Sequence, residues 1–421
     1  MTFNIHTFGC KVNIYESEYI TNIMEENGYK LSEENPDIYI INTCTVTNEA
    51  DKKDRKMINQ IRKKYPKSIL IVMGCYSQLK YKDIDADIII GNKYKSKIID
   101  LIKEYKEHKE KIVKVEDITN TNFEDMYINR FINHTRAFVK IQDGCNAFCS
   151  YCTIPYARGG LRSKDFNTAI KEVTELVKNG YKEIVLTGIH TGRYGIENNT
   201  NLEKLLKEMV KIPNIFRIRL SSIEINEITD GIIELIKNNN IMAKHLHIPL
   251  QSGSNKILEK MNRKYDLKFF NKRIEKIKKE IEDISITTDL IVGFPGETED
   301  DFNETINTLK EIKFTKIHTF PYSKREGTEA AKMKEQVDGI LKKCRVGKVL
   351  SISKEQETDF YKEKIDKVYD GIIETRGNNK KIVLTSNYIP VEVETSKENN
   401  EIVKVKILSV DNDSIKGIII E

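Results

Sequence analysis

The 421-residue sequence has no tryptophan, only 8 prolines and no apolar run long enough to cross a membrane. Its longest apolar stretches, such as residues 69–73, fall far short of the roughly 20 residues that a transmembrane helix needs. The first residues show no basic segment followed by an apolar one, so we expect no secretion, no membrane partner and a cytoplasmic location. The 7 cysteines, an odd number in such a chain, do not indicate a disulfide framework.

What the sequence does contain is typical of a globular protein with an ample core, with 39% hydrophobic and 32% charged residues. A chain of 421 residues is too long for one ordinary domain, so we expect two or three. The net charge of +5 is only mildly basic, which permits a nucleic-acid partner without requiring one.

Three cysteines, Cys145, Cys149 and Cys152, fall within one short segment that directly follows a strand-like stretch at residues 137–141. A tight loop can point three thiols at one centre, and thiolates select zinc, copper(I) or iron–sulfur clusters. A zinc site would normally close with a second pair of ligands, and the sequence has none at that spacing. The loop therefore predicts a [4Fe–4S] cluster with one iron open to a small molecule. The alternative is a group of three buried structural thiols.

Three further cysteines, Cys10, Cys44 and Cys75, each follow a short apolar run in the first hundred residues. Helix-like stretches at 15–27 and 50–64 separate these runs, which predicts a parallel α/β sheet. Strands of such a sheet present their carboxyl ends at one edge, where ligands bind. The three thiols are therefore expected to meet in a second metal–sulfur site. The alternative is that each is a small buried residue that ends its strand.

From about residue 135, six strand-like segments alternate with helix-like ones, which predicts an open (β/α)6 barrel. The strands are expected at residues 137–141, 183–187, 216–220, 245–250, 285–292 and 315–320. Polar residues and glycines gather at their carboxyl ends, where β/α barrels place their chemistry. Arginines near these ends that could meet phosphate or carboxylate groups are Arg158, Arg162, Arg193, Arg219 and Arg263. Each histidine there, taken alone, is interpreted as packed rather than catalytic.

The last 55 residues change to short alternating segments with Gly and Asn turns, which predicts a small OB-like β-barrel, a common nucleic-acid reader. The expected organisation is an N-terminal α/β domain, a linker, the partial barrel with a trailing helix, and the terminal barrel. Their predicted bounds are 1–115, 116–134, 135–355 and 356–421.

The cysteine spacing at Cys145, Cys149 and Cys152 resembles the CxxxCxxC signature of radical S-adenosylmethionine (SAM) enzymes, and Phe148 and Tyr151 stand at positions usually aromatic there. The chain as a whole is similar to the methylthiotransferase branch of that family. Similar stretches are residues 143–145, 152–159, 289–298 and 322–328, together with the N-terminal cysteines and the terminal barrel, called TRAM in the family. The segment 7–13 is similar to the type that acts on threonylcarbamoyladenosine beside the tRNA anticodon.

The resemblance implies a mechanism with two [4Fe–4S] clusters and SAM. A cluster on Cys145, Cys149 and Cys152 would bind SAM and generate a 5′-deoxyadenosyl radical that abstracts hydrogen from C2 of adenosine 37. A cluster on the N-terminal cysteines would hold or relay the sulfur, which a second SAM methylates. Strand-end candidates for the SAM pocket are Thr187, Gly188, Ser222, Glu224 and Gln251.

The implied partners are the tRNA anticodon stem-loop, gripped by the terminal barrel, a reductant such as flavodoxin or ferredoxin, and a sulfur source. The target base must be flipped or splayed to reach the barrel mouth. Alternative functions are methylthiolation of isopentenyladenosine 37 or of a ribosomal protein. A further alternative is a non-catalytic, RNA-binding iron–sulfur protein.

Overall fold

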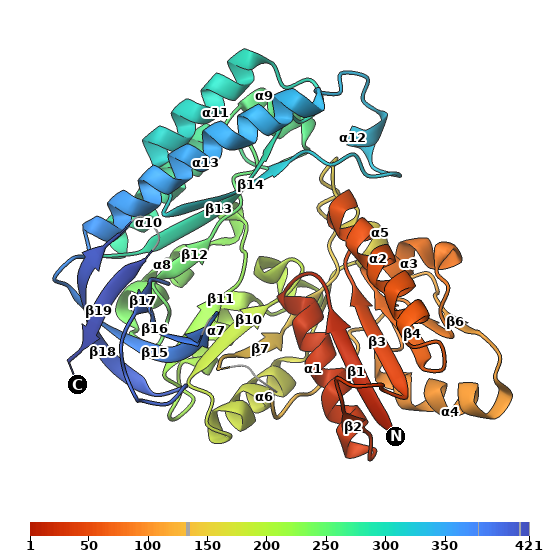
Figure 1. Cartoon of the computed structure of the whole chain (residues 1–421). Coiled ribbons are helices and arrows are strands. Elements are labelled where there is room, and N and C mark those ends of the chain that lie inside the picture. The colour runs from red at the N-terminus through yellow and green to blue at the C-terminus, as the bar shows by residue number, and fades with distance from the viewer. Residues whose placement is uncertain (132–134, 378, 412–413, 421) are drawn as a thin grey trace.

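The computed structural model describes residues 1–131, 135–377, 379–411 and 414–420. Three parts follow one another along the chain: an N-terminal sheet flanked by helices, a central curved sheet, and a small terminal barrel (Figure 1). None of the described helices combines the length and the apolarity needed to span a lipid bilayer.

The N-terminal part is a parallel sheet of six strands in the order β2-β1-β3-β4-β5-β6. The central strands β3 and β4 are buried along their whole length, because helices cover both faces of the sheet. Helices α1 and α4 pack on one face, and α2 and α3 pack on the other. The elements are β1 (Thr2–Thr7), α1 (Lys11–Glu26), β2 (Lys30–Leu31), β3 (Ile38–Thr43), α2 (Asn48–Lys64), β4 (Ile69–Gly74), α3 (Cys75–Lys80), β5 (Ile88–Ile90), α4 (Ile98–His108) and β6 (Ile112–Lys114).

The α/β prediction for this part is confirmed, with two strands that the pattern does not predict. Strand β2 pairs with β1 over two residues, and β6 pairs with β5 inside a stretch expected to be helix and linker. Both strands are too short to show periodicity in the sequence. The expected linker is partly packed, because Met126 and Ile128 are buried in the central core. Its residues 132–134 lie outside the described residues.

The central part has six parallel strands in two sheets, β11-β10-β7 and β12-β13-β14. Bridges between Ile218 and Met242 and between Ser222 and His247 join the two sheets. Among the described strands β14 does not pair with β7, so the barrel is open, as predicted. The strands are β7 (Ala137–Lys140), β10 (Glu183–Thr187), β11 (Arg217–Leu220), β12 (His245–His247), β13 (Ser285–Val292) and β14 (Lys316–Pro321).

Helices cover the outer face of this curved sheet. Helix α8 begins at Asp230, where the Thr229 side chain caps its first turn. Helix α13 packs on β14 and continues to Lys362, past the predicted boundary at residue 355 (Figure 1). The helices are α5 (Ile154–Arg158), α6 (Phe166–Lys178), α7 (Leu202–Met209), α8 (Asp230–Asn238), α9 (Asn255–Lys260), α10 (Leu267–Glu280), α11 (Glu299–Ile312), α12 (Glu329–Lys332) and α13 (Gly339–Lys362).

The inner, concave face of the curved sheet is unusually polar. Successive strand residues face opposite sides, and apolar side chains such as Ile218 and Leu246 point outward into the core under the helices. The alternate positions therefore face inward. They include Glu183, Arg217, Arg219, His245, His247, Thr287 and Asp289. We call the space that these residues line the lumen.

The terminal part is a closed five-stranded barrel in the order β15-β16-β17-β19-β18, which confirms the predicted β-barrel. Its turn at residues 385–389 enters the lumen at the amino ends of the central strands. There Arg217 and Arg219 donate to the carbonyl oxygens of Leu384 (3.0 Å) and Ser386 (3.1 Å). The strands are β15 (Val368–Arg376), β16 (Lys380–Thr385), β17 (Pro390–Glu392), β18 (Ile402–Val410) and β19 (Ile415–Ile419).

One buried carboxylate, Glu183, holds the arginines of this junction together. Its oxygens lie 2.8 Å from Arg219, 3.2 Å from Arg217 and 3.7 Å from Arg136. Burial alone would raise the pKa of Glu183, but the arginines lower it to about 2. The carboxylate is therefore ionised, and it compensates cations that water cannot reach.

Glu183→Gln should destabilise the protein by about 3 kcal/mol, because it leaves the buried Arg217 and Arg219 without their shared anion. The pKa of Glu183 is depressed, so its contribution is complete above its unfolded pKa near 4.3 and is lost as the pH falls through about 2. Urea unfolding at several pH values should show a smaller acid loss for the variant than for the wild type. Glu208→Gln, at an exposed surface pair, is the control and should change stability by less than about 0.5 kcal/mol. Equal stabilities for the two variants would contradict the assignment.

Candidate active site

The loop with Cys145, Cys149 and Cys152 starts after β8 (Gln142–Asp143), which pairs antiparallel with β9 (Arg162–Ser163). The Cys145 N–H donates to the Gly159 carbonyl at 2.9 Å, and the Cys152 N–H donates to the Cys149 carbonyl at 2.9 Å. Ser150 anchors the loop to the end of α9 through its N–H (3.1 Å) and its hydroxyl (2.7 Å). All three thiols are free and partly exposed, at the carboxyl ends of the central strands.

The two aromatic residues of the loop lie in different surroundings. Phe148 has a positive φ of 46°, exposes 52% of its surface and meets Tyr156 edge-on at 6.0 Å. Tyr151 packs against an apolar cluster that includes Phe294 and Tyr322. Phe148 is therefore free to contact a ligand, whereas Tyr151 supports the loop from beneath. Their predicted role in cofactor binding stays a prediction.

A buried histidine reaches the first cysteine of the loop. His190 Nδ1 lies 3.4 Å from Cys145 Sγ, and its Nε2 lies 2.7 Å from a carboxylate oxygen of Glu227. The Ala147 N–H donates to the same sulfur at 3.4 Å. Donors aimed at sulfur stabilise the thiolate form that a metal needs, and the carboxylate fixes the orientation of the ring. His190 is one of the strand-end histidines whose shared location favours a functional role, and its contacts place it beside the cysteine loop.

An arginine donates a hydrogen bond to the second cysteine of the loop. Arg263 Nη1 donates to Cys149 Sγ at 3.3 Å, while Nη2 forms an ion pair with Glu224. The guanidinium also lies over the Tyr265 ring at 5.0 Å. Glu224, predicted as a SAM-pocket residue, is thus connected to the cysteine loop through one side chain.

The ionisation of these thiols fits metal ligands better than nucleophiles. Burial raises the pKa of Cys149, and it raises that of Cys152 to about 12. A nucleophilic cysteine has a lowered pKa, whereas metal coordination deprotonates even a reluctant thiol. Among the described residues no three His, Cys, Asp or Glu side chains converge on a single ion. An iron–sulfur cluster is larger than one ion and needs no such convergence, so three thiols on one loop fit it.

The N-terminal cysteines lie at the carboxyl edge of the first sheet, as predicted. Cys10 follows β1, Cys44 follows β3 and Cys75 begins α3 after β4. Gly9 makes their approach possible, since a Cβ on it would lie 2.9 Å from Cys44 Cβ, and its φ of +102° suits glycine. Burial raises the pKa of Cys44 to about 12, whereas Cys10 is exposed at the surface. The Cys44 thiol therefore also resembles a metal ligand rather than a nucleophile.

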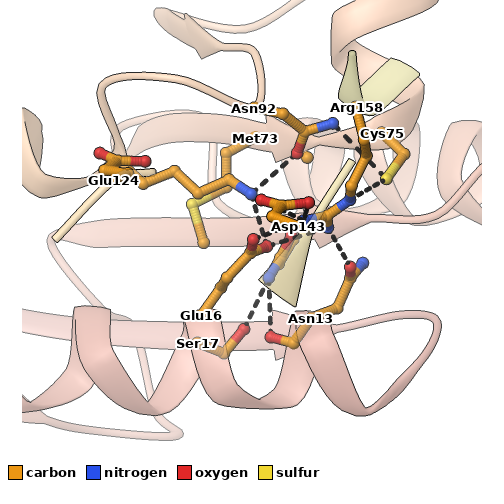
Figure 2. Close-up of polar contacts among 12 residues, drawn as sticks. Asn13, Glu16, Ser17, Met73, Cys75, Asn92, Glu124, Asp143 and Arg158 are labelled. Atoms are coloured by element: carbon orange, nitrogen blue, oxygen red, sulfur yellow. Dashed lines mark hydrogen bonds and ion pairs between the residues drawn. The ribbon is translucent and has the colours of Figure 1, made fainter. Parts of the chain in front are cut away.

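Arg158 is fully buried, and Figure 2 shows its side chain among Cys75, Asn13, Glu16 and Asp143. Its Nε donates to Cys75 Sγ at 3.2 Å, and Nη2 donates to Asn13 at 2.7 Å. Its Nη1 lies 2.6 Å from Glu16 and 3.3 Å from Asp143. Because Asp143 lies two residues before Cys145, Arg158 connects the N-terminal cysteine group to the Cys145 loop.

The positive and negative charges of the side chains around Arg158 do not balance. Glu16 and Asp143 are the carboxylates, and the cations in contact with them are Arg158, Lys95, Lys140 and Arg162. Burial alone would raise the pKa of Glu16, but Arg158, Lys95 and Lys140 hold it well below its usual range. Four cations against two ionised carboxylates leave positive charge beside Cys75. The donor set therefore favours an anionic thiolate–metal group there.

The short helix α5 separates the two cysteine groups. Cys152 lies just before it, and Arg158 at its end contacts Cys75. The Thr153 hydroxyl donates to the Thr45 carbonyl at 3.3 Å, which joins the residues that follow Cys152 and Cys44. The two predicted cluster sites are thus neighbours, although their cysteines come from different domains.

The predicted SAM-pocket residues all lie at the carboxyl ends of consecutive central strands. Thr187 ends β10 beside Lys140, and a Cβ on Gly188 would lie 3.0 Å from the Gln142 side chain. Ser222 bridges to β12, and Gln251, with φ +65°, bridges to β13. Their shared edge agrees with the prediction, while their contact with SAM stays a prediction.

The sequence analysis missed Glu227, Gln142 and Asn92. The Asn92 side chain donates to Cys75 Sγ at 3.5 Å, and the Gln142 side chain accepts from the His190 N–H at 2.6 Å. Asn92 lies two residues after the end of the apolar strand β5, and this position is the one sequence signal that could have found it. The other two act through contacts between distant segments.

Two family descriptions match this chain. "Radical SAM superfamily" matches residues 139–309, which hold the Cys145 loop, and "Uncharacterized protein family UPF0004" matches residues 2–91, which hold the N-terminal cysteines. A radical SAM domain implies SAM and a [4Fe–4S] cluster. Among solved structures, the radical SAM methyltransferase TsrM from Kitasatospora setae has a TM-score of 0.55 at 14% identity. It covers 76% of this chain and 72% of its own, a likeness that concerns the fold alone.

Curated relatives match nearly the whole chain. "Threonylcarbamoyladenosine tRNA methylthiotransferase MtaB" of Bacillus subtilis is 44% identical over 97% of this chain and 94% of its own length. The MtaB of Aquifex aeolicus is 37% identical over 97% and 100%. "tRNA-2-methylthio-N(6)-dimethylallyladenosine synthase" of Clostridium tetani is 36% identical over 99% and 96%. The chain belongs to the radical SAM methylthiotransferase family, and within that family to the MtaB type.

Proposed function

We propose that this protein replaces the C2 hydrogen of N6-threonylcarbamoyladenosine 37 in tRNA with a methylthio group, using SAM and two [4Fe–4S] clusters. The observation that carries the proposal is the pair of cysteine groups on either side of helix α5. It is supported by similarity to relatives named for this substrate over almost their full length. A purely RNA-binding protein would need neither the second thiol group nor the polar lumen.

Each cysteine group has its own task in this proposal. Cys145, Cys149 and Cys152 hold the cluster that binds SAM, while His190 and Arg263 stabilise its thiolates by hydrogen bonds. When bound, SAM and its reduced cluster supply the 5′-deoxyadenosyl radical that removes the C2 hydrogen. The second cluster, on Cys10, Cys44 and Cys75, holds the sulfur. Arg158 orients Cys75 beside it by hydrogen bonding.

The remaining predicted roles belong to the same proposal. Strand-end residues hold SAM across the mouth of the lumen, together with Phe148 and Tyr151 of the cysteine loop. The terminal barrel grips the anticodon stem-loop, and the base enters the lumen in a flipped position. A reductant such as flavodoxin or ferredoxin and a sulfur source complete the cycle, in the cytoplasm. The strand-end residues are Thr187, Gly188, Ser222, Glu224 and Gln251.

Cysteine variants should separate the two clusters. Cys149→Ala should abolish 5′-deoxyadenosine formation, because the cluster that binds SAM loses a ligand. Cys44→Ala should retain SAM cleavage but lose methylthiolation and about half of the bound iron. Cys344→Ala, at an exposed free thiol on α13, is the matched control and should retain both activities. If Cys44→Ala keeps the iron content of the wild type, Cys44 is not a ligand.

Arg158→Met should lower methylthiolation at least about tenfold while SAM cleavage persists, because Cys75 loses its charged hydrogen-bond donor. The fold should survive, since Lys95, Lys140 and Arg162 still neutralise Glu16 and Asp143. Single-turnover assays with reconstituted protein measure both steps. Arg130→Met, at an exposed ion pair with Glu25, should behave as wild type. A parallel fall of both activities in Arg158→Met would contradict a role confined to the second cluster.

The substrate is tested by mass spectrometry of tRNA nucleosides from cells that lack this protein. The 2-methylthio form of N6-threonylcarbamoyladenosine should disappear and its unmodified precursor should accumulate. Re-expression of the wild type should restore the modification, and re-expression of Cys149→Ala should not. Loss of the methylthio form of isopentenyladenosine instead would overturn the assigned substrate.

A further inference from the structure

Strand β14 presents an exposed histidine, His318, to the lumen. The preceding residue, Ile317, is buried in the central core under the helices, and side chains alternate along a strand, so His318 points inward. The ring contact agrees, because the centroid of the His318 ring lies 5.7 Å from that of His247. Within the described parts of the chain, the ring nitrogens of His318 have no hydrogen bond or ion pair.

His247, in contrast, is held in place through both of its ring nitrogens. Its Nδ1 lies 2.9 Å from the Thr287 hydroxyl, and its Nε2 lies 3.2 Å from a carboxylate oxygen of Asp289. The same Thr287 hydroxyl lies 3.1 Å from Nε2 of the buried His245. The His247 ring is therefore fixed from two sides, and it forms a rigid wall next to the free imidazole of His318.

His318 lies below the mouth of the lumen, in a part that solvent reaches. Asp289 and His318 pair directly in the register of β13 and β14, and each stands three residues before the end of its strand. At about 3.3 Å per residue, they are roughly 10 Å from the strand ends. The side chains of His247 and Asp289 are 18% and 32% exposed, and His318 is also exposed. A polar group of a ligand can therefore reach His318 at this depth.

The proposed substrate carries a matching group. A threonylcarbamoyl group ends in a carboxylate, whereas a dimethylallyl group is apolar. C2 and C6 of adenine flank N1, so a base that presents C2 at the strand ends can direct its N6 substituent down the lumen. We propose that the imidazole N–H of His318 donates a hydrogen bond to the carboxylate of the threonylcarbamoyl group, beside the fixed ring of His247. The proposal rests on the proposed function and names the residue that recognises the N6 substituent.

The hydrogen-bonding groups at this place favour an anion over an apolar substituent. An imidazole keeps at least one N–H donor in either protonation state, so His318 can always donate to a carboxylate. Asp289 is the carboxylate that pairs with His318 in the register, and its contact with His247 offsets its repulsion of a second anion. An apolar N6 substituent would cover the nitrogens of His318 without offering them a partner. His318 therefore acts as a specificity residue.

The test compares two anticodon stem-loops, one with threonylcarbamoyladenosine and one in which a carboxamide of the same shape replaces its carboxylate. Wild-type holoenzyme should bind the carboxylate RNA about tenfold more tightly by fluorescence anisotropy, because hydrogen bonds to charged acceptors are stronger. His318→Leu should bind both RNAs alike, whereas His318→Gln, which keeps an N–H donor, should retain most of the preference. His108→Leu, at an exposed histidine on α4, is the matched control and should retain all of it.

Iron content and RNA-independent SAM cleavage should be unchanged in His318→Leu, and a fall in either would make His318 a structural residue and overturn the inference. A preference for the carboxylate that survives in His318→Leu would also overturn it and leave the proposed function intact. Equal binding of the two RNAs by the wild type would overturn the carboxylate as a recognition element for any residue. Failure of the proposed function is visible separately, as a wild type that forms no methylthio product on the carboxylate RNA.

Discussion

The buried ion pairs that Arg158 and Lys140 share with Glu16 are the constraint on which the arrangement of this protein depends. Arg158 belongs to the central domain, whereas Glu16 and Cys75, which it contacts, belong to the N-terminal domain. Separating the domains would leave charges at the interface uncompensated or force their rehydration, which is costly for groups placed this deeply. The two cysteine groups are consequently held at a fixed relation by electrostatics as well as by packing. The proposed reaction, in which sulfur held at one site would reach a radical formed at the other, needs that fixed relation.

Positively charged side chains lie beside both sets of thiols, but the side chains are arranged differently at the two places. At the Cys145 loop, His190 and Arg263 each hold a carboxylate on one side and a sulfur on the other. At Cys75 the cations outnumber the carboxylates within one buried network. In both places the donors are oriented by groups behind them, so they do not have to reorganise when a metal–thiolate group forms. Burial raises the pKa values of Cys44 and Cys152, so these thiols would become anionic through the proposed metal ligation.

The features that sequence could predict are those expressed in local spacing. The alternation of apolar runs and helical stretches predicted the three folds, and the spacing of Cys145, Cys149 and Cys152 predicted one metal site. The position of Cys10, Cys44 and Cys75 at strand ends predicted their shared edge. Contacts between distant segments could not be predicted in this way. Arg263 meets Cys149 across 114 residues, and nothing in the pattern around either one indicates the other. Strands β2 and β6 were missed because two or three residues are too few to show a period.

The position of the terminal barrel against the central sheet is the feature of the fold that is hardest to predict from the sequence. The turn at residues 385–389 of this barrel packs against the central sheet. Arg217 and Arg219 donate hydrogen bonds to carbonyl oxygens at the turn, and Tyr388 stacks on His245. An RNA held by this barrel must therefore use its outer surface and not that turn. The same turn closes one end of the lumen, so the terminal barrel and this end of the lumen are one rigid unit. In the proposed function, the fold would therefore set the distance from the RNA-binding barrel to the lumen, and a base of the anticodon loop would reach the strand ends without a separate adjusting motion.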